Sequence, residues 1–133
     1  MLQQIQPLLQ VQDLDLSVTF YCEQLGFSGG VVDEGFAMVS RDQCTIYLAQ
    51  KTKSVDVTNK AARKVVDGWC NYDFLIQCKH GTLDALHKEF TDNGVEWLDC
   101  FQNGPEDRPY GMRDFSVFDP DGYDLVFAEP TEN

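Results

Sequence analysis

The sequence predicts an α+β fold in which two tandem β-α-β-β-β modules form curved mixed sheets around a cleft. Three observations predict it: the two halves repeat one order of apolar and amphipathic segments, each amphipathic segment ends at a glycine, and related segments keep constant spacings. Because 133 residues are too few for two ordinary domains, we expect a single domain over 1–133. It comprises a first module at about 1–50, a linker at 51–68 and a second module at about 69–133.

Each module is predicted to open with an apolar strand, at 8–11 in the first and at 74–78 in the second. An amphipathic helix follows, over about 15–25 and about 82–93, because apolar residues recur there at helical spacing. Both helices are followed by a glycine, Gly26 or Gly94, which predicts a left-handed C-cap.

The later part of each module reads as strand, tight turn, strand, and 36–50 aligns with 115–129 at a spacing of 79 residues. The turn Asp119-Pro120-Asp121-Gly122 favours a hairpin, since proline presets φ and glycine accepts a positive φ. The helices are only 68 residues apart, so an 11-residue insertion lies in the second module, between Trp97 and Arg113. We expect this insertion to be a lid or a binding loop.

The formal net charge of -12 excludes the electrostatic attraction that nucleic-acid binding requires. Most of the negative charge, -10, lies in 69–133. No apolar run approaches the roughly 20 residues of a membrane-spanning helix, and the N-terminus lacks the features of a signal peptide. We therefore expect a cytoplasmic protein with no membrane partner, in which most of the five cysteines are buried and reduced.

Several segments resemble the vicinal oxygen chelate superfamily, which includes glyoxalase I, extradiol dioxygenases and bleomycin-resistance proteins. They are Val11-Gln12-Asp13-Leu14, Leu25-Gly26-Phe27, Tyr110-Gly111-Met112-Arg113-Asp114-Phe115 and Asp119-Pro120-Asp121-Gly122-Tyr123. The resemblance implies the glyoxalase/bleomycin-resistance fold. It covers nearly the whole chain except the linker, and it is strongest toward bleomycin-resistance proteins, which are also acidic, metal-free binders.

The resemblance places the metal-ligand positions of the superfamily's enzymes on Gln6, Tyr47, Asp73 and Val126. Valine has no lone pair to donate, and a neutral tyrosine is a poor ligand. We therefore expect no metal, no cofactor and no catalytic residue. His80 is expected in a turn and His87 on the solvent-facing side of a helix, away from the cleft.

The remaining candidates are aromatic and acidic, and the alternative for most of the aromatic residues is a place in the core. Predicted ligand-binding residues are Phe36, Tyr47, Trp69, Asp73, Trp97, Phe101, Tyr110, Met112 and Phe115. Aromatic faces and carboxylates favour a cationic, partly aromatic small molecule, sequestered in the cleft of a homodimer. Two other functions stay open: a superfamily enzyme (lyase, isomerase or dioxygenase) with a divergent active site, and a structural protein with a vestigial cleft.

Overall fold

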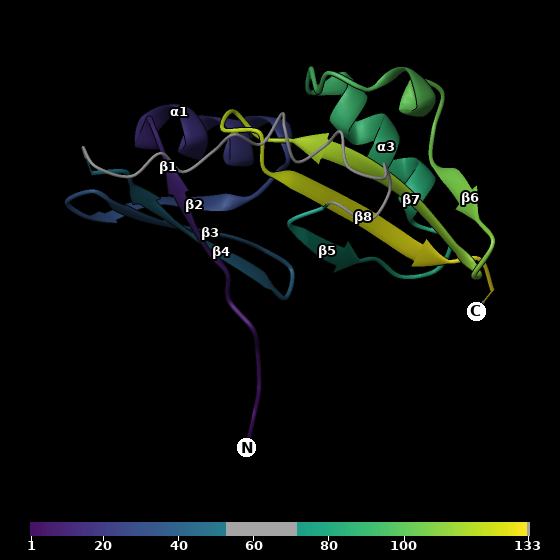
Figure 1. Cartoon of the computed structure of the whole chain (residues 1–133), viewed down its shortest axis with the longest axis horizontal. Helices are drawn as coiled ribbons and strands as arrows, with labels where there is room; N and C mark the ends of the chain where they lie inside the picture. The colour runs from purple at the N-terminus through teal and green to yellow at the C-terminus, as the bar shows by residue number, and fades with distance from the viewer. Residues whose placement is uncertain (53–71, 133) are drawn as a thin grey trace. The chain divides into compact units, whose positions relative to one another are not determined.

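The computed structural model describes residues 1–52 and 72–132. These belong to two compact units, Met1–Asn59 (unit 1) and Lys60–Asn133 (unit 2), and each unit is described by itself. Each contains a four-stranded mixed sheet and a helix between its first two strands, which confirms the predicted α+β fold of two β-α-β-β-β modules (Figure 1). No helix among the described residues is long and apolar enough to span a membrane.

The elements of unit 1 follow the predicted order: β1 (Leu8–Val11), α1 (Leu14–Thr19), η1 (Phe20–Gln24), β2 (Ser28–Asp33), β3 (Phe36–Arg41) and β4 (Cys44–Gln50). The predicted single helix is thus an α-helix that continues as a π-helical turn, η1. Asp13 caps its N-terminus, because its carboxylate accepts a hydrogen bond from the Leu16 amide at 3.1 Å. Gly26 follows with a φ of 71°, so the predicted left-handed glycine is confirmed.

The sheet of unit 1 has the order β1-β4-β3-β2, with β1 parallel to β4 and the other pairs antiparallel. Strand side chains alternate between its two faces. One face contacts α1 and carries fully buried residues such as Val39 and Leu48. No helix among the described residues covers the other face, which we call the helix-free face of unit 1 and which carries Leu8, Phe36 and Met38.

Unit 2 repeats the arrangement with β5 (Phe74–Gln77), α3 (Leu83–Asp92), η3 (Asp99–Phe101), β6 (Glu106–Arg108), β7 (Met112–Phe118) and β8 (Asp124–Pro130). Its sheet has the order β5-β8-β7-β6. Phe90 of α3 packs edge-on against Phe115 at 5.9 Å and Phe127 at 5.2 Å between ring centroids, which fixes the face that the helix covers. The predicted insertion is not a bare loop, since it contains η3 and the edge strand β6.

The strand registers of the two units are equivalent. Leu8 lies opposite Tyr47 in unit 1, and Leu75 lies opposite Val126 in unit 2. Gln6 and Asp73 precede Leu8 and Leu75 by two residues each, so the backbone repeat places the four superfamily metal-ligand positions at matching points of the two sheets.

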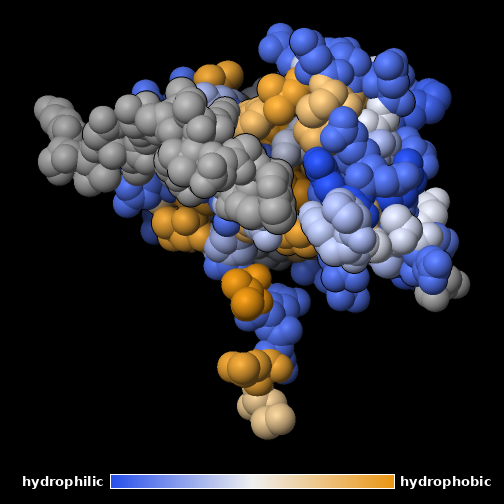
Figure 2. Space-filling view, turned by 45° about the vertical axis from the view of Figure 1, so that its right-hand side comes forward, coloured by the Kyte–Doolittle hydropathy of each residue, from blue (hydrophilic) through white to orange (hydrophobic). Residues whose placement is uncertain are grey.

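The segment that precedes β1 carries apolar side chains that are almost completely exposed, among them Met1, Leu2 and Ile5. Figure 2 shows this hydrophobic surface on the projecting N-terminal end of the chain.

Strand β2 contains a glycine that its backbone requires. Gly29 has a φ of 136°, and a Cβ atom there would overlap the carbonyl oxygen of Met38 on the neighbouring strand. At Gly30, by contrast, an added Cβ would meet no atom within 4 Å.

We therefore expect Gly29→Ala to lower the free energy of unfolding by at least about 2 kcal/mol, because it adds backbone strain and a steric overlap. Gly30→Ala is the matched control and should change it by less than about 0.5 kcal/mol. Urea denaturation followed by circular dichroism measures both, and equal effects of the two substitutions would contradict the close approach of β2 to β3.

Candidate functional site

The helix-free face of unit 1 presents an aromatic and apolar surface. The Phe36 and Tyr47 rings stack at 5.5 Å between centroids with an interplanar angle of 20°, and both side chains are half-buried. Met38 lies opposite Tyr47 in the ladder and is 37% exposed, while Leu8 on the adjoining strand is 53% exposed. Sheet pairing therefore places Phe36 and Tyr47, two of the predicted ligand-binding residues, side by side on an accessible surface.

The Tyr47 hydroxyl is held in place by the segment that precedes β1. It donates a hydrogen bond to Oε1 of Gln6 at 3.0 Å, and Nε2 of Gln6 donates to Oε1 of Gln4 at 2.8 Å. Two of the four superfamily metal-ligand positions thus contact each other through a neutral phenol and a carboxamide.

The other two positions lie in unit 2. Oδ2 of Asp73 accepts a hydrogen bond from the backbone amide of Asp124 at 2.8 Å, and Val126 offers no donor atom. No group of three or more His, Cys, Asp or Glu side chains in the described part of the chain could hold a metal ion. The donor chemistry of these positions does not fit the divalent metal of the superfamily's enzymes, which needs three or four converging nitrogen or oxygen ligands.

The helix-free face of unit 2 is mixed in charge. Because Phe115 points toward α3, its neighbours Asp114 and Ser116 lie on the opposite face. Arg108 of β6 reaches Asp114 through three hydrogen bonds of 2.8 to 3.1 Å, and its Nη1 lies 3.5 Å from Oε2 of Glu106. This face therefore carries two carboxylates and one guanidinium.

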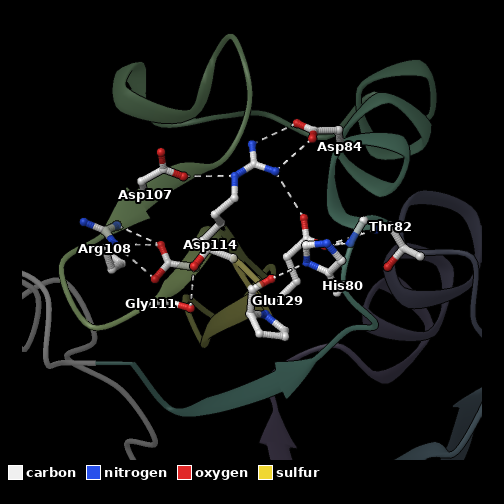
Figure 3. Close-up of polar contacts among 12 residues, drawn as sticks. His80, Thr82, Asp84, Asp107, Arg108, Gly111, Asp114 and Glu129 are labelled. Atoms are coloured by element: carbon white, nitrogen blue, oxygen red, sulfur yellow. Dashed lines mark hydrogen bonds and ion pairs between the residues drawn. The ribbon is translucent and has the colours of Figure 1, made fainter. Parts of the chain in front are cut away.

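A second ionic cluster lies on the helix-covered side and surrounds Arg113. Figure 3 labels its three carboxylates, Asp84, Asp107 and Glu129. The Arg113 guanidinium contacts Asp84 of α3 at 2.9 Å, Asp107 of β6 at 3.0 Å and Glu129 of β8 at 3.1 Å. Hydrogen bonding to Asp84 raises the pKa of Arg113, and the same bond lowers the pKa of Asp84. We call these four residues the Arg113 cluster, and it ties the three strands β6, β7 and β8 to the start of α3.

Glu129 has a structural role at the N-terminus of α3. Its side chain is fully buried, and its Oε2 accepts hydrogen bonds from the amides of Gly81 and of Thr82, the latter at 3.1 Å. A carboxylate at this point satisfies amide groups that the helix leaves without partners and interacts favourably with the helix dipole. Sequence reasoning missed this role, because Glu129 lies near the end of an apolar strand and nothing in its position points to the helix.

Two predicted ligand-binding residues, Phe101 and Phe115, are buried in the core of unit 2 and expose almost no surface to a ligand in this unit. Trp97 is half-buried and packs edge-on against Phe115 at 5.0 Å between ring centroids. Tyr110 and Met112, in contrast, lie at the turn between β6 and β7 and at the start of β7, and Tyr110 is 58% exposed.

The prediction that His87 faces solvent is wrong. The side chain is buried, stacks on Trp97 at 4.2 Å between ring centroids, and places Nε2 2.6 Å from the carbonyl oxygen of Phe101. The helical spacing of Leu83, His87 and Phe90 puts all three on the buried side of α3, and this spacing was the available signal. His80 lies in an exposed turn as expected, with Nδ1 2.9 Å from the Pro130 carbonyl oxygen. Trp69 lies outside the described residues.

The lowered pKa of Asp84 makes its contribution to stability pH-dependent. The ion pair with Arg113 stabilises the fold above the ordinary carboxyl pKa of about 4, and this contribution is lost as pH falls through the lowered pKa. We expect Asp84→Asn to reduce stability at pH 7 by less than about 1 kcal/mol, because the pair is largely exposed, and to converge with the parent protein in strong acid.

Urea denaturation across this pH range measures the effect. Asp92→Asn is the control in the same helix, because it removes an exposed ion pair, Lys88–Asp92, that does not involve Arg113. A difference between Asp84→Asn and the parent that persists in strong acid would contradict the assignment.

Several solved structures are similar over nearly the whole chain. A glyoxalase/bleomycin resistance protein/dioxygenase from Nocardioides is 19% identical with a TM-score of 0.68, and the match covers 100% of this chain and 87% of that one. A bleomycin resistance determinant encoded on the transposon Tn5 is 20% identical with a TM-score of 0.69, covering 97% and 98%. A bleomycin-binding protein complexed with bleomycin is 21% identical with a TM-score of 0.69, covering 96% and 98%. At these identities the likeness shows the fold.

No protein with a curated description matches the chain significantly. The family model described as "Glyoxalase/Bleomycin resistance protein/Dioxygenase superfamily" matches residues 2–127. The match therefore spans both β-α-β-β-β units. The chain belongs to the glyoxalase/bleomycin resistance protein/dioxygenase superfamily.

Proposed function

We propose that this protein binds a cationic, partly aromatic small molecule without a metal, as bleomycin-resistance proteins sequester their ligand. The observation that carries the proposal is the stacked Phe36–Tyr47 pair on the helix-free face of unit 1. Stacked rings on an accessible sheet face offer a flat surface to heterocycles, and their π faces attract positive charge.

The charge of the chain supports a cationic ligand. A net charge of -12 produces a potential that attracts cations and speeds their capture. On the helix-free face of unit 2, Glu106 and Asp114 outnumber Arg108 by one charge. Tyr110 and Met112 lie next to this group in the chain and add an aromatic and an apolar contact.

The side chains at the superfamily's metal-ligand positions support a function in ligand binding, because they do not form a metal site. Gln6 and Tyr47 hydrogen-bond each other, and Val126 offers no donor atom. Bleomycin is the specific ligand that we propose first, because one structural neighbour is a bleomycin-binding protein in complex with that drug.

The affinity for bleomycin should depend on the accessible aromatic side chains Tyr47 and Tyr110. We expect Tyr47→Ala and Tyr110→Ala each to weaken binding of metal-free bleomycin about tenfold, since each removes a stacking surface. Added salt should also weaken binding, because part of the attraction is between exposed charges. Isothermal titration calorimetry measures the affinities.

Leu16→Ala is the matched control, because Leu16 is an exposed apolar residue of α1 on the helix side of unit 1, and it should leave the affinity unchanged. Dialysis against EDTA should also leave it unchanged, and loss of binding on chelation would favour the superfamily-enzyme alternative. If calorimetry shows no saturable binding to the parent protein, bleomycin is not the ligand.

We also propose that the protein is a homodimer and that dimerisation completes the ligand cleft. Exposed apolar surface supports this, since Met1, Leu2, Ile5 and Leu8 are all more than half exposed.

The four described cysteines, Cys22, Cys44, Cys78 and Cys100, are free thiols, which supports the proposed cytoplasmic location. None of the four is fully buried, contrary to the expectation for most of them.

The dimer should persist in solution and should depend on the apolar surface near β1. We expect multi-angle light scattering to give twice the chain mass of 15.1 kDa, and Leu2→Gln/Ile5→Gln to shift the equilibrium toward monomer. Leu98→Gln, at an exposed leucine of unit 2, is the control. A monomer at all accessible concentrations would contradict the proposal.

A further inference from the structure

Two carboxylates face each other on the helix-free face of unit 2. Glu106 of β6 and Asp114 of β7 are direct partners in the antiparallel ladder. Like charges directly opposite each other destabilise a sheet, and this pair lies at the edge strand, where only three residues hold β6 in place. The arrangement therefore requires a positive charge between them.

Arg108 supplies that charge from within the same strand. It is two residues from Glu106, so both side chains lie on one face. Its Nε donates to both carboxylate oxygens of Asp114, at 3.0 and 3.1 Å, and its Nη2 donates to Oδ1 at 2.8 Å. Its contact with Glu106 is longer, 3.5 Å from Nη1 to Oε2.

The two carboxylates are consequently not equivalent. The Asp114 side chain is only 10% exposed and is occupied by the guanidinium, whereas the Glu106 side chain is 41% exposed and weakly held. Hydrogen bonding to Asp114 raises the pKa of Arg108, so the guanidinium keeps its charge at any pH at which the protein is folded.

We propose that Arg108 is a built-in counter-cation that determines the charge specificity of the helix-free face of unit 2. It occupies the place between Glu106 and Asp114 that a divalent metal ion or the second charge of a dication would otherwise take. Glu106 alone then remains to pair with a single positive group of a ligand. This last step rests on the proposed function; the exclusion of divalent ions does not.

The opposite role, in which Asp114 orients Arg108 to hold an anionic ligand, is less consistent with the charges. The group of three residues has a net charge of -1, and Glu106 would repel an anion that approached Nη1. The experiment below separates the two roles.

The test removes the charge of Arg108 and uses Ca²⁺ alone as the probe, because oxygen ligands suit this ion and no organic ligand is needed. Arg108→Gln keeps a hydrogen-bond donor for Asp114 and loses the charge. Arg108→Lys keeps the charge and is the matched control. Arg108→Gln/Glu106→Gln removes one of the two carboxylates.

We expect Arg108→Gln to bind Ca²⁺ at least about tenfold more tightly than the parent protein in calorimetry, because a neighbouring positive charge has been removed. Arg108→Lys should behave as the parent does, and the double variant should lose the gain. Equal Ca²⁺ affinity of Arg108→Gln and the parent would overturn the proposal. So would an equal gain in the double variant, or saturable phosphate binding by the parent that Arg108→Gln abolishes.

Arg108→His provides a second test should Arg108→Gln fold poorly. Its imidazole is charged at about pH 5.5 and neutral at about pH 8, so this variant should bind Ca²⁺ more tightly than the parent protein at the higher pH only. Ca²⁺ binding independent of this pH change would overturn the proposal. Neither test depends on whether bleomycin binds.

Discussion

In the described part of the chain, each sheet is packed against one α-helix, and one helix covers only one face. Strand side chains alternate between faces, so every second residue points into the core and the others form the second face of the sheet. In unit 1 the core residues include Val39 and Leu48, and the others include the stacked Phe36 and Tyr47. The same division in unit 2 separates Phe115, under α3, from Asp114, its neighbour in the chain. The aromatic surface of unit 1 and the charge-paired surface of unit 2 both follow from this constraint.

Charged side chains of β6 form ion pairs with those of β7 on both faces of the sheet of unit 2. Asp107 and Arg108 are adjacent in β6, so they point to opposite faces, and each finds its partner on β7: Arg113 on the helix side and Asp114 on the other. The helix side uses its cluster to join β6, β8 and α3, with buried Glu129 capping the helix. Arg108 and Arg113, the two arginines in the described part of unit 2, are thereby engaged by carboxylates, and the rest of the negative charge dominates the potential of the chain.

Much of the fold could be predicted from the sequence because its two halves repeat the same pattern of strands and helices. Apolar periodicity and the glycines that follow the helices, Gly26 and Gly94, define strands and helices in both halves, and the matched registers of Tyr47 and Val126 agree with the spacing of the repeat. The site is less predictable. The prediction that His87 faces solvent fails because its spacing from Phe90 places it on the buried side of α3. The partners of Glu129 lie 16 to 48 residues away, a distance over which periodicity carries no information about contact.

Strand β6 is an edge strand that is held to its sheet by few backbone contacts. Only three residues pair it to β7, and side-chain ion pairs on both faces supply much of the remaining attachment. The exposed pair with Asp107 is screened by dissolved ions, whereas the nearly buried Arg108–Asp114 pair is screened much less and the aromatic packing of Phe90, Phe115 and Phe127 is not screened. Raising the ionic strength therefore weakens the attachment of this edge strand on its helix side, while the aromatic interior of unit 2 keeps its packing.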